Sequence, residues 1–176
     1  MSSYERKSFF NWPASALIIL KKYRMQVETA DQAAQIANAK IQEGKFSLAH
    51  EILVLGNERF PNHPAILRFL GVAKFHIGDD KGALQVLYKA LEFNTTDVMV
   101  LSYLGATEFM VGKYTEALEH LNNALTIDPN HVFTLVKRGE VKRKLGELED
   151  AIKDFDRAHE LDPTDLFNLS FRGEGN

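Results

Sequence analysis

The sequence predicts an all-α protein built as a linear array of antiparallel helix pairs. Three observations predict this fold: small residues recur every 34 residues, apolar residues recur at helical spacing between them, and glycine or proline interrupts each helical stretch. The period is carried by four series whose members lie 34 residues apart: Gly71, Gly105 and Gly139; Gly78, Gly112 and Gly146; Ala83, Ala117 and Ala151; and Ala90, Ala124 and Ala158. Independent positions do not keep a common register by chance, so the chain is a repeat array.

The array is expected to hold four units, at residues 30–63, 64–97, 98–131 and 132–165. Within the third unit, apolar residues at helical spacing precede Gly112 and resume after it, so each unit is predicted to be two helices joined by a glycine turn. Glycine takes the positive φ that ends a helix, at Gly78, Gly112 and Gly146. Proline ends the second helix at Pro61, Pro129 and Pro163, and residues 94–97 are expected to cap the helix that follows them.

A second glycine series lies inside the first helices. Gly71, Gly105 and Gly139 each cost about 1 kcal/mol relative to alanine in a helix interior. A repeated cost of this kind predicts that a partner helix presses on the backbone at these three positions, with Ala83, Ala117 and Ala151 allowing the approach from the second helix.

The two ends do not follow the four complete units. Residues 1–29 are predicted to form an extension whose helix either caps the first unit or mediates self-association through Phe9, Phe10, Trp12, Leu17 and Ile18. Residues 166–176 repeat the opening of the fourth unit and are expected to form a partial fifth repeat or a C-terminal cap. Whether the chain is a fragment of a longer array stays open.

Composition excludes several classes of function. The 176 residues are 45% hydrophobic and 26% charged, with a net charge of −3, which predicts no attraction to nucleic acid or anionic lipid. There is no cysteine, so disulfides, thiolate catalysis and cysteine-ligated zinc are excluded, and a reducing, cytoplasmic location is expected. No apolar run approaches the roughly 20 residues of a membrane span.

The repeated residues resemble the signature of the tetratricopeptide repeat family, in which leucine, Leu-Gly, two alanines, an aromatic residue and proline hold fixed places. The matches are Leu67, Leu70, Gly71, Ala83 and Ala90 in the second unit; Leu101, Leu104, Gly105, Ala117, Ala124 and Pro129 in the third; and Leu135, Gly139, Ala151, Phe155, Ala158 and Pro163 in the fourth. The first unit is degenerate, and the tyrosine usual after Leu-Gly is replaced by Lys74, Glu108 and Lys142.

The resemblance implies a right-handed superhelix whose first helices line a concave groove that binds extended or helical peptides. The residues expected to line this groove are Arg68, Phe69, Val72, Phe75, Met99, Tyr103, Phe109, Met110, Phe133, Lys137, Arg143 and Lys144. Its middle is apolar and aromatic and its end is basic. Phe75 and Phe109 fit the core between repeats equally well, whereas Tyr103, Phe69 and Phe133 are better candidates for the groove.

The basic stretch from Lys137 to Lys144 has two interpretations. It is either a solvated helix face paired with Glu140, Glu147 and Glu149, or a site for acidic residues that flank the apolar anchors of a partner.

One specialised function within the family is not expected. Co-chaperones of this family that hold the acidic C-terminus of heat-shock chaperones use a clamp of lysine, asparagine and arginine side chains on three first helices. Across the first three units only Asn38 matches that pattern, and across units two to four Arg68 stands alone beside Val72, Tyr103, Phe133 and Lys137. Aromatic and aliphatic side chains offer a carboxylate no charge-assisted donors, so a carboxylate-clamp partner is not predicted.

The sequence contains no catalytic constellation. Its six histidines lack metalloprotease spacing, and neither a phosphate-binding loop nor a nucleophile motif occurs. We therefore predict a non-catalytic, chaperone-like scaffold or adaptor that binds a protein or peptide without cofactor or metal. Two alternatives stay open: a homo-oligomerising assembly module, including a dimer through the terminal helices, and the recruiting part of a larger protein.

Overall fold

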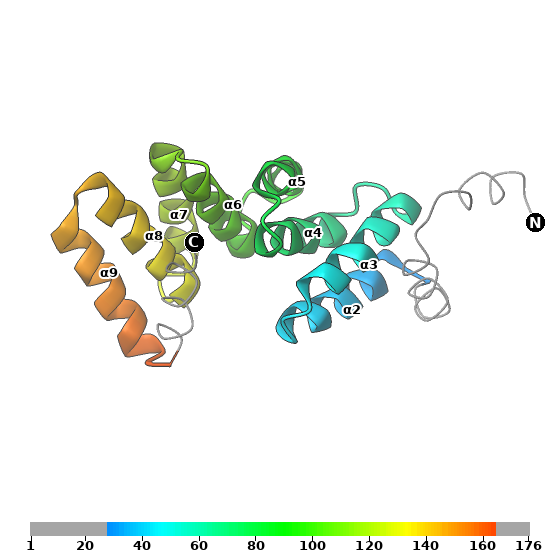
Figure 1. Cartoon of the computed structure of the whole chain (residues 1–176), viewed down its shortest axis with the longest axis horizontal. Helices are drawn as coiled ribbons and strands as arrows, with labels where there is room; N and C mark the ends of the chain where they lie inside the picture. The colour runs from blue at the N-terminus through cyan, green and yellow to red at the C-terminus, as the bar shows by residue number, and fades with distance from the viewer. Residues whose placement is uncertain (1–27, 165–176) are drawn as a thin grey trace, which may run out of the picture.

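The computed structural model describes residues 28–164, which form eight α-helices and no strand (Figure 1). The helices are α2 (Ala30–Gln42), α3 (Phe46–Arg59), α4 (Pro64–His76), α5 (Asp80–Phe93), α6 (Val98–Met110), α7 (Tyr114–Ile127), α8 (Val132–Leu145) and α9 (Leu148–Leu161). Each of the four 34-residue intervals in the sequence thus holds one helix pair. Within the described range the all-α expectation is confirmed.

The chain reverses within each pair at a glycine in the left-handed region. The φ angles are 72° at Gly44, 79° at Gly78, 81° at Gly112 and 85° at Gly146. A Cβ atom would clash with the backbone in this conformation, which is why the same residue type recurs at each turn. The predicted turn function of Gly78, Gly112 and Gly146 is confirmed.

Side chains cap several of the helix starts. The Thr29 hydroxyl accepts from the Gln32 backbone N–H at 3.2 Å, and the Gln32 side chain accepts from the Thr29 backbone, which completes a capping box on α2. Asp97 accepts from the Val100 backbone N–H at 3.1 Å and so caps α6. The predicted capping role of residues 94–97 is therefore confirmed at Asp97.

The mid-helix glycines lie where a leucine or phenylalanine of the second helix crosses the first. A Cβ at Gly71 would lie 2.5 Å from Leu87 Cγ, and one at Gly139 would lie 2.6 Å from Phe155 Cε1. At Gly105 it would meet Leu121 Cγ at 2.6 Å and the Ala117 carbonyl oxygen at 3.0 Å. The prediction that a partner helix presses on these glycines is confirmed.

The helix pairs follow one another in an elongated array, from α2 and α3 at one end to α8 and α9 at the other (Figure 1). Each helix packs on its partner and on the next pair, and consecutive first helices also pack together, as α2 on α4, α4 on α6 and α6 on α8. Within the described part, no consecutive second helices pack to a comparable extent. The first helices therefore lie on the inner side of the array, where their side chains form one wall.

Two predictions fall outside the described residues. The extension helix before residue 28 and the partial fifth repeat or cap at 166–176 belong to the ranges 1–27 and 165–176, drawn in grey in Figure 1. Among the helices of residues 28–164, none combines the length and the hydropathy needed to cross a bilayer.

Candidate functional site

Aromatic rings from α3, α4, α6 and α8 touch in succession. The Phe46 and His76 rings stack with centroids 4.0 Å apart, and His76 Nε2 lies 3.2 Å from the Tyr103 hydroxyl. Tyr103 in turn stacks on Phe133 at 4.7 Å, and Phe75 meets the Tyr103 ring edge-on at 5.4 Å. We call these five residues the aromatic ribbon. It includes at least one residue from each of the four helix pairs, through α3, α4, α6 and α8, because consecutive first helices pack on each other.

A buried polar contact between the chain neighbours of Tyr103 and Phe133 holds α6 and α8 together. The Ser102 and Thr134 hydroxyls, both fully buried, are 2.5 Å apart, and Thr134 also lies 2.6 Å from His131 Nδ1. Burial lowers the pKa of His131, so the imidazole that meets Thr134 is held toward its neutral form. These hydrogen bonds join the segments of α6 and α8 that carry Tyr103 and Phe133.

Two of the predicted groove residues lie in the core instead. Phe69 is 8% exposed and Val72 is 2% exposed. Phe69 belongs to the same cluster as Ala34 and Ala37 of α2, whose small side chains leave room for its ring. These two positions cannot offer an open surface without a rearrangement, so the wall is narrower than the sequence suggested.

The remaining apolar candidates divide between core and surface. Phe109 packs beside Tyr114 against the cluster of Ala117, Leu121 and Val141, and Phe75 packs against the cluster that contains Leu87 and Leu104. The core interpretation therefore holds for Phe109, while Phe75 serves both the core and the ribbon. Met99 is half-buried, and Met110 is exposed at the end of α6.

The basic candidates differ in whether an acidic group neutralises them. Arg68 lies 3.2 Å from Asp97 with its guanidinium over the Phe69 ring, and Lys137 lies 2.9 Å from Glu140 and faces the Phe133 ring at 5.8 Å. Arg143 and Lys144 make no ion pair within residues 28–164. Among the predicted groove residues, the positive charge that has no ion pair in the described part thus lies at the C-terminal end of α8.

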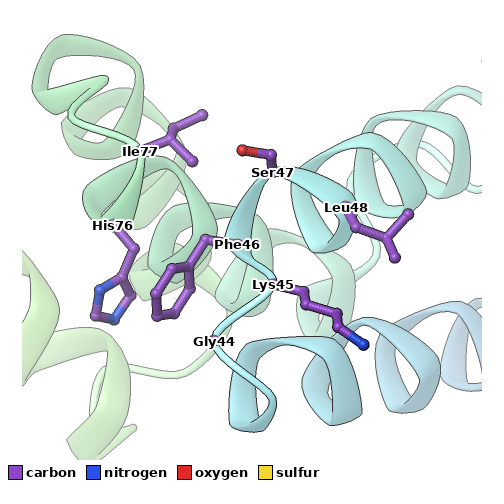
Figure 2. Close-up of a pocket in the computed structure, with 7 residues that line it drawn as sticks. All are labelled: Gly44, Lys45, Phe46, Ser47, Leu48, His76 and Ile77. Carbon is purple, nitrogen blue, oxygen red and sulfur yellow. The ribbon is translucent and has the colours of Figure 1, made fainter. Parts of the chain in front are cut away.

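A shallow pocket of about 480 Å³ opens at the first end of the ribbon (Figure 2). It is lined by Gly44, Lys45, Phe46, Ser47, Leu48, His76 and Ile77, so it joins the first glycine turn to the end of α4. Phe46 was not among the predicted site residues because it belongs to a second helix. The sequence nonetheless held a signal. Phe46 lies two repeat lengths before Tyr114, so an aromatic residue is the first residue of both α3 and α7.

A buried polar cluster on the other side of α6 was also missed. The fully buried carboxylate of Glu108 accepts a 2.5 Å hydrogen bond from the Tyr88 hydroxyl and lies 2.8 Å from His120 Nδ1. The hydrogen bond to Glu108 raises the pKa of His120, and burial together with Glu108 raises the pKa of Tyr88 to about 12. The signal was the replacement of the usual tyrosine by Glu108, whose charge requires partners from α5 and α7.

This Glu108–His120 pair holds a carboxylate beside an imidazole, but no solvent-accessible surface of Glu108 remains to meet a substrate. Within residues 28–164, no group of three or more histidine, aspartate or glutamate side chains is arranged to hold a metal ion.

Comparison with known proteins agrees with this geometry. Two tetratricopeptide repeat models match the chain, one over residues 35–98 and the other over residues 97–163. No curated protein matches it. Among solved structures, a crystal structure of MamA aligns with 19% identity and a TM-score of 0.65, over 86% of this chain and 89% of that one. MamA 41-end from Desulfovibrio magneticus RS-1 aligns with 24% identity and a TM-score of 0.63, over 77% of each chain.

The MamA structures resemble this chain in fold, and the family models match in sequence across all four helix pairs. Together with the glycine turns, the mid-helix glycines at the helix crossings and the packed first helices, they identify the chain as a member of the tetratricopeptide repeat family.

Proposed function

We propose that the chain is a non-catalytic interaction scaffold that holds a segment of a partner protein against the wall of its first helices. The observation that carries this proposal is the aromatic ribbon, in which rings from four helices present half-buried faces and edges along one surface. Aromatic side chains supply large apolar contact areas with little loss of conformational entropy, and they are frequent among the residues that dominate binding energy.

The arrangement suits a partner segment with apolar anchors in its middle. Tyr103 is central, because it contacts Phe75, His76 and Phe133 at once. An anchor inserted beside Tyr103 would meet ring surface on three sides. We also propose that the scaffold has a chaperone-like role. Since the sequence lacks cysteine, we propose that it operates in the cytoplasm.

The proposal is tested with peptides selected from a random library on the full 176-residue chain. We expect the Tyr103→Ala and Phe133→Ala variants to bind such peptides at least about tenfold more weakly in titration calorimetry, because an anchor would lose its stacking surface. Ile127→Ala, an exposed aliphatic change on α7 outside the wall, serves as the control. Circular dichroism verifies that the helices remain, and Tyr103→Phe, which keeps the stack, should restore most of the affinity.

Selected peptides that bind all variants equally would contradict the groove model. The proposal would also fail if Ile127→Ala weakened binding as much as Tyr103→Ala.

One observation favours a second candidate function, that of a self-assembling module. Leu148 and Ile152 on α9 are 58% and 57% exposed, whereas Leu118, the equivalent of Ile152 one repeat earlier, is half-buried. In the described part, α9 thus presents an apolar face that the next repeat would cover elsewhere in the array. If this face joins two chains, light scattering should show a concentration-dependent dimer that Ile152→Asp abolishes, and a wild-type monomer at every concentration would exclude this candidate.

A further inference from the structure

Three exposed aliphatic side chains of the array lie where the first helices α4, α6 and α8 end. Ile77, Val111 and Leu145 are 39%, 42% and 42% exposed, and each immediately precedes the glycine of a turn. They are spaced 34 residues apart, so they occupy the same place in three consecutive repeats, and Met110 adds to them beside Val111. We call these four residues the apolar rim. Solvent-exposed turns favour polar residues, so three aliphatic residues in phase require another explanation.

The rim adjoins the aromatic ribbon but is a different surface. Ile77 lines the pocket of Figure 2 together with Phe46 and His76, and the rim then continues past the ends of α6 and α8. None of the four side chains belongs to the core clusters or takes part in the ring stacks of the wall. A partner could therefore contact the rim without any rearrangement of the core.

The spacing of the rim limits what can bind along it. Consecutive first helices pack on each other, and packed helices have axes about 8–10 Å apart. An α-helix advances about 10.5 Å in seven residues, so side chains one heptad apart on a partner helix would meet Ile77, Val111 and Leu145 in turn. An extended strand presents its same-face residues about 6.6 Å apart and would fall out of register. Polyproline helices have a suitable pitch but dock on aromatic grooves, and the rim is aliphatic.

Charge defines the partner further. Lys113 follows Val111 by two residues, and Arg143 and Lys144 precede Leu145; none of these three cations has an ion pair within residues 28–164. Glu147, beyond the last turn, offsets part of this charge, and at the opposite end Asp79 and Asp80 lie beside Ile77. The Val111 and Leu145 half of the rim is thus basic, which favours acidic residues on the partner at that end.

We propose that the apolar rim binds an amphipathic helix of a partner protein, with apolar residues at heptad spacing and acidic residues flanking those that meet Val111 and Leu145. This surface goes beyond the proposed groove function and does not depend on it.

The probe is a set of fluorescein-labelled peptides of about 21 residues, three heptads in length. The first peptide is rich in glutamate with one leucine per heptad, the second has the same composition with its leucines moved off a common face, and the third replaces glutamate by lysine. Fluorescence anisotropy with the full 176-residue chain should show the first peptide binding about tenfold more tightly than both others.

Variants assign the binding to the rim. Val111→Asp and Leu145→Gln should each weaken the first peptide about tenfold or more, since each removes an apolar contact. Ile127→Asp, a similarly exposed aliphatic residue on α7 away from the rim, should leave it unchanged, and so should Tyr103→Ala. Circular dichroism checks that Val111→Asp still folds, and Leu145→Gln provides the second reading if it does not.

Four results would overturn the proposal. Equal binding of the first two peptides would show that heptad spacing is not recognised. Failure of the wild-type chain to bind the first peptide would show that the rim does not bind such a helix. If Tyr103→Ala abolishes binding while Val111→Asp does not, the peptide occupies the groove, which supports the proposed function and refutes the rim. Light scattering that shows a dimer dissociated by Val111→Asp would instead assign the rim to a second copy of the chain.

Discussion

At the scale of single residues, the mid-helix glycines Gly71, Gly105 and Gly139 show how one missing Cβ atom sets the distance between two helices. The three positions look alike in sequence, yet their neighbours differ. The absent Cβ of Gly105 faces the Ala117 carbonyl oxygen at 3.0 Å and the fully buried Leu121, whereas that of Gly139 faces only the ring of half-buried Phe155. Backbone cannot move aside as a terminal side chain can, so the same substitution should have unequal effects.

We predict that Gly105→Ala lowers the free energy of unfolding by about 1–3 kcal/mol despite the better helix propensity of alanine, because the overpacked Cβ must push α7 away. Gly139→Ala should cost less, since the Phe155 ring can rotate toward solvent. Urea denaturation of both variants measures the difference. Equal losses, or a more stable Gly105→Ala, would mean that the helices tolerate a wider crossing than the structure shows.

Asp154 is a second residue on which a local arrangement depends. Its nearly buried carboxylate accepts from Arg138 Nε at 2.8 Å and Arg138 Nη2 at 2.6 Å, and lies 2.8 Å from Lys142 Nζ. Two of the cations that the sequence suggested for binding are therefore used to join α8 to α9.

Asp154→Asn should lower the free energy of unfolding by about 2–3 kcal/mol, because two partly buried cations lose their charged acceptor. Asp150→Asn is a suitable control: Asp150 pairs with Lys153 at 2.7 Å on the same helix, but both side chains are more than half exposed, so little change is expected. Thermal unfolding followed by circular dichroism compares the two, and similar melting temperatures would contradict the prediction.

At the scale of helices, the cluster of Glu108, Tyr88 and His120 joins three of them. Glu108 comes from α6, Tyr88 from α5 and His120 from α7, so one buried carboxylate connects two consecutive repeats. The pKa of His120 is raised in the folded state, which means that the folded chain binds this proton more tightly than the unfolded chain does. The resulting stabilisation is fully present below the ordinary histidine pKa of 6.5 and is lost as the pH rises through the higher folded value.

This predicts that the difference in unfolding free energy between the wild type and His120→Gln is largest near pH 6 and shrinks as the pH rises above 7. The difference between the two proteins must be used, because burial lowers the pKa values of His50 and His131 and gives the wild type an opposing trend. Urea denaturation at several pH values provides the measurement. A difference that does not vary with pH would show that the His120 proton does not contribute.

At the scale of the whole molecule, each helix pair packs only on its neighbours within the described part of the chain. Stability in such an array is close to a sum of terms for each pair and for each interface. The two inner pairs, α4 with α5 and α6 with α7, have a neighbour on both sides, whereas the described structure gives α2 with α3 and α8 with α9 one neighbour each.

Amide hydrogen exchange should therefore be slowest in α4 to α7 and faster in α3 and α9, since the outer pairs can open without disrupting two interfaces. Mass spectrometry of exchanged peptides resolves the four pairs separately. Uniform protection across residues 28–164 would indicate that the array unfolds as one cooperative unit.

The sequence by itself determined the features that depend on neighbours along the chain or exactly one repeat away. The helix pairs, the positive φ of Gly78, Gly112 and Gly146, the cap at Asp97 and the pressure on the mid-helix glycines all follow from local stereochemistry repeated at a constant interval. The residue types that recur at this interval also resemble the signature of the family. Such features do not require the position of any distant side chain to be known.

Only the tertiary structure decided which side chains at equivalent positions are accessible. Phe69, Tyr103 and Lys137 lie one repeat apart, yet Phe69 enters the core beside the small residues of α2, Tyr103 stacks in the aromatic ribbon, and Lys137 pairs with Glu140. The ion pairing of Arg138 and Lys142 with Asp154, and of Lys137 with Glu140, likewise left Arg143 and Lys144 as the cations of the basic stretch 137–144 that have no ion pair within the described residues. The physical reason is that exposure and pairing depend on the volumes and charges contributed by adjacent helices, which differ from repeat to repeat even where the backbone period is constant.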